Sequence, residues 1–155
     1  MQRLLLTIYA FASLSPFAFA QQNEAPMTYH AHGTFTVEMQ PLTPAPAEGL
    51  SRFSIVKQIH GDLEATSKGE MLSGGNPKQG EAGYVAMEVV TGTLNGKHGS
   101  FALQHSATMD RSGQKMTVIV VPGSGMGELK GIAGTFIIHI ENEQHSYEFE
   151  YTLPE

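Results

Sequence analysis

The side chain with the clearest capacity for chemistry is His105, one of seven histidines in the chain. It lies in an alternating run in which Phe101, Leu103 and Ala107 share its face, so a strand here would turn it toward an apolar interior. A neutral imidazole in that position can accept a proton or form a hydrogen bond with a ligand. The alternative is a core histidine held by a hydrogen bond, and the sequence alone leaves both open.

Lys57 raises the same question, because it alternates with Phe53, Ile55 and Ile59. An unpaired ammonium is costly to bury, so we expect Lys57 either to pair with a carboxylate or to extend its amine to water. The candidate carboxylates are Glu64, Glu70 and Glu88. Such a pair would form a polar island in an apolar interior, either as a structural ion pair or as an anchor for a ligand.

The facing of Glu88 is ambiguous from the sequence. It shares a strand face with Tyr84, and the opposite face carries Val85, Met87 and Val89. If the apolar face points inward, Glu88 lies outside and has no role in an interior site. If the strand faces the other way, Tyr84 and Glu88 both enter the interior. A register shift of one residue reverses every side chain, so both arrangements remain open.

The last strand-like run carries an aromatic stripe formed by Tyr147, Phe149 and Tyr151. A stripe of this kind is typical of a packed core. It can also form a shelf for a ligand, and on that reading Tyr147 is a candidate binding residue.

The other patterns that resemble functional sites are weak. His30 and His32 lie two apart on one strand face, a spacing that can bind zinc or copper, but no third ligand can be identified. The segment Gly123-Ser124-Gly125 is not a nucleophile elbow, because no glycine lies two residues either side of the serine. It is not a dinucleotide-binding loop either, since no helix follows it. We therefore predict no metal and no cofactor.

The sequence begins with the features of an export signal. Residues 1–20 hold a short positive start and then an apolar stretch that ends in a small-x-small cleavage pattern. We expect cleavage after Ala20, a short polar tail over residues 21–26 and a single domain over residues 27–155. The mature protein is expected to be periplasmic in a Gram-negative host and secreted otherwise, with no stable membrane anchor.

Composition excludes several classes of protein. The 155 residues include no cysteine, so thiol chemistry and cysteine-bound metals are ruled out. The formal net charge is −6, and an acidic chain of this kind offers no basic patch to nucleic acid or to anionic lipid. Solubility alone explains the acidic balance.

The rest of the chain alternates strand-like runs with turn signals and shows no sustained helical periodicity. The runs expected as strands are Met27 to Met39, Leu50 to His60, Asp62 to Leu72, Ala82 to Thr91, Ser100 to Met109, Lys115 to Val121, Gly134 to Glu141 and Ser146 to Leu153. The glycine-rich segment before the last two runs is expected to be a tight crossing between strands. About eight strands fit a closed antiparallel β-barrel with room for side chains or one small ligand. A β-sandwich is the alternative.

Four ordered motifs lie in this β-rich part of the chain. They are Gly61 to Leu72, Gly83 to Glu88 with Thr91 to Leu94, Gly99 to His105, and Val120 to Gly134. Together they resemble the bacterial domain-of-unknown-function family 3224, over nearly the whole mature chain. The resemblance implies an eight-stranded antiparallel barrel similar to that of allene oxide cyclase and plant dirigent proteins. It implies no activity, and no cyclase catalytic residue can be matched to a position in this chain.

We therefore expect an all-β protein, an eight-stranded antiparallel β-barrel that binds a small apolar or amphipathic molecule in its lumen. The candidate ligand-binding residues are Lys57, Glu88, His105 and Tyr147. One alternative is a cyclase or isomerase that moves a proton with His105 or Glu88 in the same lumen. Another is a closed structural barrel with no ligand. Besides the ligand, the partner expected is a further copy of the chain in a homo-oligomer.

Overall fold

The computed structural model describes residues 27–154 and shows an all-β protein. The signal peptide and polar tail expected over residues 1–26 lie outside the described residues. The strands are β1 (Thr28–Leu42), β2 (Leu50–Gly61), β3 (Leu63–Asn76), β4 (Glu81–Leu94), β5 (Lys97–Asp110), β6 (Gly113–Val120), β7 (Met126–Gly127), β8 (Ala133–Glu141) and β9 (Gln144–Thr152). A single 3₁₀ turn, η1 (Pro77–Gln79), joins β3 to β4, and no helix within residues 27–154 could cross a membrane.

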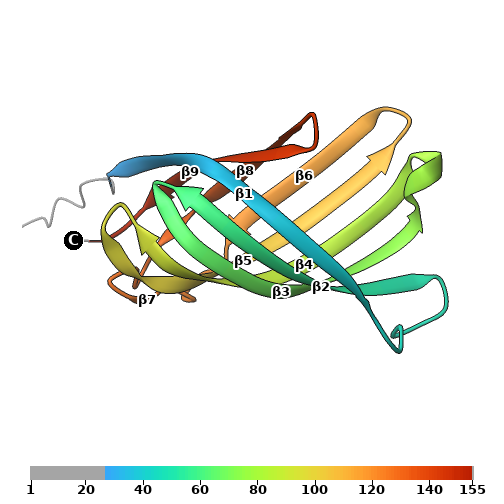
Figure 1. Cartoon of the computed structure of the whole chain (residues 1–155), viewed down its shortest axis with the longest axis horizontal. Coiled ribbons are helices and arrows are strands. Elements are labelled where there is room, and N and C mark those ends of the chain that lie inside the picture. Colours follow the sequence, from blue (N-terminus) through green and yellow to red (C-terminus); the bar gives the residue numbers. More distant parts are fainter. Residues whose placement is uncertain (1–26, 155) are drawn as a thin grey trace, which may run out of the picture.

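The long strands close into an antiparallel barrel with one extra short strand, β7 (Figure 1). Around the barrel the order is β4, β3, β2, β1, β9, β8, β6 and β5, and β4 then pairs with β5 to complete the circle. The eight-stranded barrel is therefore confirmed, and the β-sandwich alternative is wrong. Closure leaves no free edge on the long strands and creates an interior that is shielded from water.

Turn chemistry sets the register of the hairpins. The sequence predicts a hairpin connection over Gly92 to Gly99, with Asn95-Gly96 inside it. The structure confirms the hairpin, because Asn95 and Gly96 have φ values of 47° and 83°, as a type I′ turn requires. The sequence also predicts a loop over Ser73 to Gly80, and this is wrong at its start, because β3 continues to Asn76. Its glycines pair with β4 in the ladder, for example Gly74 with Gly83.

The glycine-rich segment after β6 does more than cross between strands. It runs back along β5, where Gly127 of β7 pairs with Gly99. A Cβ on Gly99 would collide with the carbonyl oxygen of Met126, so this close approach needs glycine. The segment then places Leu129 and Ile132, each 1% exposed, in the core at this end of the barrel. It thereby seals one end, beside the C-terminus in Figure 1.

Aromatic side chains fill the sealed half of the barrel. Phe101 stacks on Phe149 with ring centroids 5.6 Å apart, and Phe136 stacks on Tyr147 at 4.8 Å. All four are buried. The space for a ligand therefore has to lie toward the opposite end.

Candidate functional site

Strand β4 turns its polar face into the lumen. Glu88 is buried, whereas Val85, Met87 and Val89 are each about half exposed on the outer surface. Ala86, Val90 and Leu94 are buried with Glu88 and fix this facing, because residues two apart on a strand share a face. Of the two arrangements that the sequence left open, the structure therefore shows the one in which Glu88 and Tyr84 enter the interior.

Glu88 is the centre of a buried polar cluster formed with Lys57, Ser67 and His105. The Lys57 Nζ lies 2.6 Å from Glu88 Oε1, and the His105 Nε2 lies 2.8 Å from the same oxygen. The Ser67 hydroxyl donates to Glu88 Oε2 at 2.6 Å. All four residues are buried. The structure thus brings together three of the four predicted site residues and adds Ser67.

Strand register explains why these residues meet. Lys57 of β2 is paired with Ser67 of β3, and Gly69 of β3 is paired with Glu88 of β4. A Cβ on Gly69 would collide with the backbone of β4 and lie 2.6 Å from the Glu88 Cβ, so glycine allows the two strands to approach here. His105 of β5 is paired with Ala86 of β4, and this places the His105 side chain diagonally from Glu88.

The cluster holds Glu88 in its charged form. Burial alone would raise the pKa of this carboxyl, but the hydrogen bond from His105, the charge and hydrogen bond of Lys57 and the Ser67 hydroxyl lower it to about 2. An ionised carboxylate only accepts hydrogen bonds, so the His105 Nε2 must carry a hydrogen. With three donors on its oxygens, Glu88 is a fixed negative charge rather than a proton carrier, and it orients the imidazole.

A cavity of about 270 Å³ lies in the lumen beside this cluster. Its walls are mainly apolar, and its polar contributions come from Lys57, Tyr84, His105 and His145. The apolar lining residues are Phe35, Val37, Met39, Ile55, Met71, Met116, Ile138 and Ile140. Met39 and Ile140 are exposed, at 41% and 56%, so the cavity reaches the surface where they lie.

Within residues 27–154, the His105 Nδ1, the Tyr84 hydroxyl and the His145 ring nitrogens in the cavity wall have no hydrogen-bond partner in the protein. Every fully buried side-chain nitrogen and oxygen of the described residues does have a partner. The His105 Nδ1 and the Tyr84 hydroxyl are therefore not fully enclosed, and both residues line this cavity. Burial, and secondarily the charge of Glu88, raises the pKa of Tyr84, so its hydroxyl keeps its proton.

The structure places Tyr147 away from this cavity. Its ring stacks on Phe136 in the sealed half of the barrel. Its hydroxyl accepts a hydrogen bond from the Leu63 backbone N–H at 3.1 Å. These contacts give Tyr147 a structural role in the core, where it satisfies a buried backbone donor.

His145 is a cavity residue that the sequence did not indicate. The sequence predicts a loop over Asn142 to His145 that would leave His145 in solvent. This is wrong, because the β8–β9 turn is tight and leaves His145 on β9. Its ring lies 5.0 Å from that of Phe35 on β1. The expected loop began at Asn142, which together with Glu143 takes positive φ values and closes the turn within two residues.

The paired histidines of β1 do not form a metal centre. His30 and His32 are exposed on the outer face, as is the Glu150 that pairs with His30. Within residues 27–154, no three His, Cys, Asp or Glu side chains come together in a way that could hold a metal ion.

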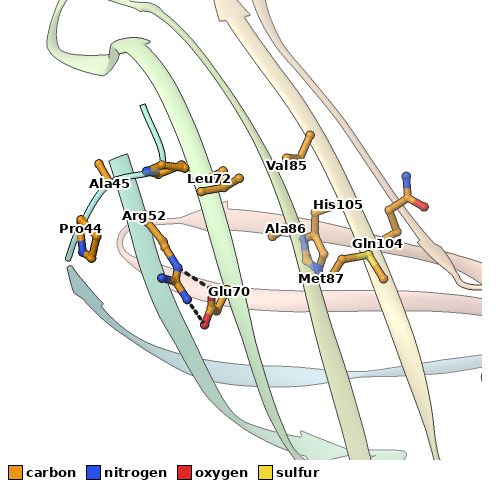
Figure 2. Close-up of a pocket in the computed structure, with 11 residues that line it drawn as sticks. Pro44, Ala45, Arg52, Glu70, Leu72, Val85, Ala86, Met87, Gln104 and His105 are labelled. Atoms are coloured by element: carbon orange, nitrogen blue, oxygen red, sulfur yellow. Dashed lines mark hydrogen bonds and ion pairs between the residues drawn. The ribbon is translucent and has the colours of Figure 1, made fainter. Parts of the chain in front are cut away.

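A second hollow of about 660 Å³ lies on the outer surface (Figure 2). The proline-rich loop at Pro44 borders it, with outward-facing Met87 of β4 and Gln104 of β5 on the other side, and His105 also lines it. Arg52 of β2 and Glu70 of β3 line it and pair with each other through hydrogen bonds of 2.7 and 2.8 Å. Since this ion pair is exposed and satisfied, it offers a ligand less than the buried cluster does.

Fold and site together define a class: an antiparallel β-barrel, sealed at one end, with a buried ion-pair cluster beside a mainly apolar cavity. The family model described as "Protein of unknown function (DUF3224)" matches residues 31–151, and the chain belongs to this family. The chain is also similar to the crystal structure of a DUF3224 protein of unknown function from Shewanella oneidensis MR-1. That likeness has 42% identity and a TM-score of 0.75, and it covers 83% of this chain and 99% of the other. Among curated proteins, none matches this chain.

Proposed function

We propose that the protein binds a small apolar or amphipathic molecule in the lumen cavity. The observation that carries this proposal is the polar cluster of Lys57, Glu88 and His105 at the wall of a mainly apolar cavity. Ligand sites are commonly apolar cavities with a few fixed polar groups that orient the ligand.

Stability alone is a poor reason for the cluster. Two charges are costly to bury, and well-packed apolar side chains of similar volume often serve a core equally well or better. A buried pair between Lys57 and Glu88, with a cation–π contact of 5.0 Å from the amine to the Phe35 ring, is better explained as a preorganised anchor.

Methionine methyl groups provide the test. Met71 and Met116 line the cavity, whereas Met87 lies on the outer face of the same barrel wall. In a titration of ¹³C-methyl-labelled protein with 1-octanol and octanoic acid, we expect saturable shifts of the Met71 and Met116 resonances and none for Met87. Uniform shifts, or none at any concentration below micelle formation, would contradict the proposal.

Neighbouring residues of β8 supply a matched pair of variants. Ile138 lines the cavity and Ile137 is 45% exposed on the opposite face. We expect Ile138→Trp to fill the cavity and abolish the saturable shifts, and Ile137→Trp to leave them unchanged. Equal effects of the two substitutions would mean that binding occurs elsewhere.

A second candidate function is a cyclase or isomerase in the same lumen. The observation that favours it is the imidazole of His105, which lines the cavity and which Glu88 orients through a hydrogen bond to Nε2. A carboxylate–imidazole pair of this kind is suited to general base catalysis. An enzyme would release a chemically altered product, which mass analysis of the bound and released molecules would detect.

We also propose that the protein is exported, on the pattern of residues 1–20. Mature protein from the exported compartment should then begin at Gln21.

A homo-oligomer is a further proposal, supported by the exposed apolar side chains of Val85, Met87 and Val89 on the outer face of β4. Light scattering of the purified protein would give its mass in solution.

A further inference from the structure

We propose that the lumen site selects weak acids: an amphipathic molecule whose carboxylic acid O–H meets His105 Nδ1 and gives up its proton there. This inference rests on the proposed binding function and names the class of ligand. The O–H bond of the ligand breaks, an N–H bond forms at Nδ1, and the ligand anion remains beside the new imidazolium. No other bond changes.

The first support is the hydrogen-bond inventory of His105. Its side chain is 4% exposed, and its Nε2 donates to the ionised Glu88 at 2.8 Å. The remaining nitrogen, Nδ1, is then the acceptor in the neutral ring, and it has no protein partner within residues 27–154. A nearly buried acceptor that faces a cavity calls for a ligand group that donates, and the hydroxyl of a weak acid does so.

The second support is a hydrogen-bond donor on the adjacent strand that lines the same cavity. Tyr84 and His105 both line the cavity, and Tyr84 is paired with Ala107, which places the two side chains on adjacent strands in a diagonal relation. Diagonal neighbours on a sheet lie roughly 7–8 Å apart between backbones, within reach of long side chains. A carboxylic acid presents one donor and one acceptor about 2 Å apart, so it can give its proton to His105 and accept from Tyr84.

The third support is the balance of charge around His105. Lys57 of β2 and Glu88 of β4 form an ion pair that cancels within the cluster. The other titratable groups that face the cavity are Tyr84 of β4 and His145 of β9, while β3 contributes Ser67 to the cluster. On β1, β6 and β8 the cavity-lining side chains are apolar.

This arrangement discriminates by ligand charge. When His105 takes a proton, Glu88 stabilises the imidazolium and the cluster becomes positive overall, which suits a bound anion. A permanently cationic head group finds no free carboxylate in the cavity wall, because all the hydrogen bonds that Glu88 accepts come from protein donors. The site should therefore reject alkylammonium compounds of the same chain length.

The experiment compares three probes with one alkyl chain: octanoic acid, 1-octanol and octyltrimethylammonium. Calorimetric titrations at pH 8 in buffers of different ionisation enthalpy measure the protons exchanged on binding. Imidazoles are ordinarily neutral at this pH, so we expect uptake of about one proton for each octanoate bound. We expect no uptake with 1-octanol and no binding of the cation. The affinity for octanoate should rise as the pH falls from about 8 to about 6, while that for 1-octanol stays constant.

Two histidine variants locate the proton. His105→Gln keeps an amide donor for Glu88 but has no basic nitrogen. We expect it to lose the proton uptake and to bind octanoate about tenfold more weakly or worse, with a smaller loss of affinity for 1-octanol. His145→Gln removes the other imidazole that lines the cavity and should keep the uptake. The ¹⁵N resonance of His105 Nδ1 should move from the acceptor to the protonated position with octanoic acid alone.

The outcomes separate the two proposals. If 1-octanol and octanoate both shift the Met71 and Met116 methyl resonances without proton uptake, the lumen binds ligands and the inference about acids is wrong. Proton uptake that persists in His105→Gln, or disappears in His145→Gln, also overturns it. If no probe shifts those resonances, the proposed function and this inference fail together.

Discussion

Removing the charge of Glu88 should destabilise the barrel more than any ordinary surface change. In Glu88→Gln the Lys57 ammonium stays buried, at 7% side-chain exposure, without its counter-ion. Opposite charges 2.6 Å apart attract with a gross energy of about 6 kcal/mol at an effective dielectric constant of about 20. Part of this attraction offsets desolvation, and breaking a buried pair on one side typically destabilises by about 3–5 kcal/mol.

The pKa of Glu88 leads to a similar magnitude by a separate route. Its value of about 2 in the folded protein, against an ordinary 4.5, corresponds to about 3 kcal/mol of stabilisation. Because the folded-state pKa is the lower one, this contribution is fully present above about pH 4.5 and is lost as the pH falls toward about 2. Both routes agree on a loss of about 3–5 kcal/mol at neutral pH, or roughly 10–20 °C in Tm for a domain of this size.

Urea unfolding followed by far-ultraviolet circular dichroism is the assay, since the chain has no tryptophan. Wild type, Glu88→Gln, Lys57→Met and the double variant are compared at pH 7 and at lower pH. The double variant should be more stable than Glu88→Gln alone by about 2 kcal/mol, because it leaves no unpaired charge. The gap between wild type and Glu88→Gln should also shrink between about pH 4.5 and pH 2.

Two results would refute this reasoning. One is a Glu88→Gln variant within about 1 kcal/mol of wild type at pH 7, which would place the carboxylate in water. The other is a stability gap that does not change with pH, which would mean that charge is not what the substitution removes.

Other substitutions test how the site is built and where it ends. Gly69→Ala should lower Tm and displace Glu88, because its Cβ would collide with the backbone of β4; an unchanged crystal structure and Tm would contradict this. Tyr147→Phe should lower the free energy of unfolding in urea by about 1–3 kcal/mol, because it leaves the Leu63 N–H without its acceptor. It should not change the affinity for octanoate, and a loss of that affinity would mean that Tyr147 belongs to the binding site. Tyr84→Phe should weaken octanoate binding by calorimetry about tenfold while sparing 1-octanol; equal losses would show that the hydroxyl does not contact the acid.

The barrel was predictable because its signals are local. Alternation along strand-like runs and turn dipeptides such as Asn95-Gly96 determine strands and hairpins directly. The sealed end was not predictable in the same way. The glycines before β8 indicate tight backbone, but the pairing of Gly127 with Gly99 is a contact between distant parts of the chain.

The site was predictable in part. Polar residues in apolar runs identified Lys57 and His105, and both are buried in the cluster. The facing of β4 was not predictable, because the apolar Val85, Met87 and Val89 lie outside while the charged Glu88 lies inside, which reverses the usual preference. Ser67 was missed because a small polar residue on a strand carries no signal of burial until its partner is known.

Native mass spectrometry of the protein recovered from the cells that make it tests the central claim most directly. Wild type and Ile137→Trp should carry a reproducible extra mass that denaturation releases, and Ile138→Trp, with its cavity filled, should carry none. If wild type carries no extra mass, and neither variant differs from it in binding 1-octanol or octanoate, the lumen is a packed interior and the proposal of a ligand-binding barrel is contradicted.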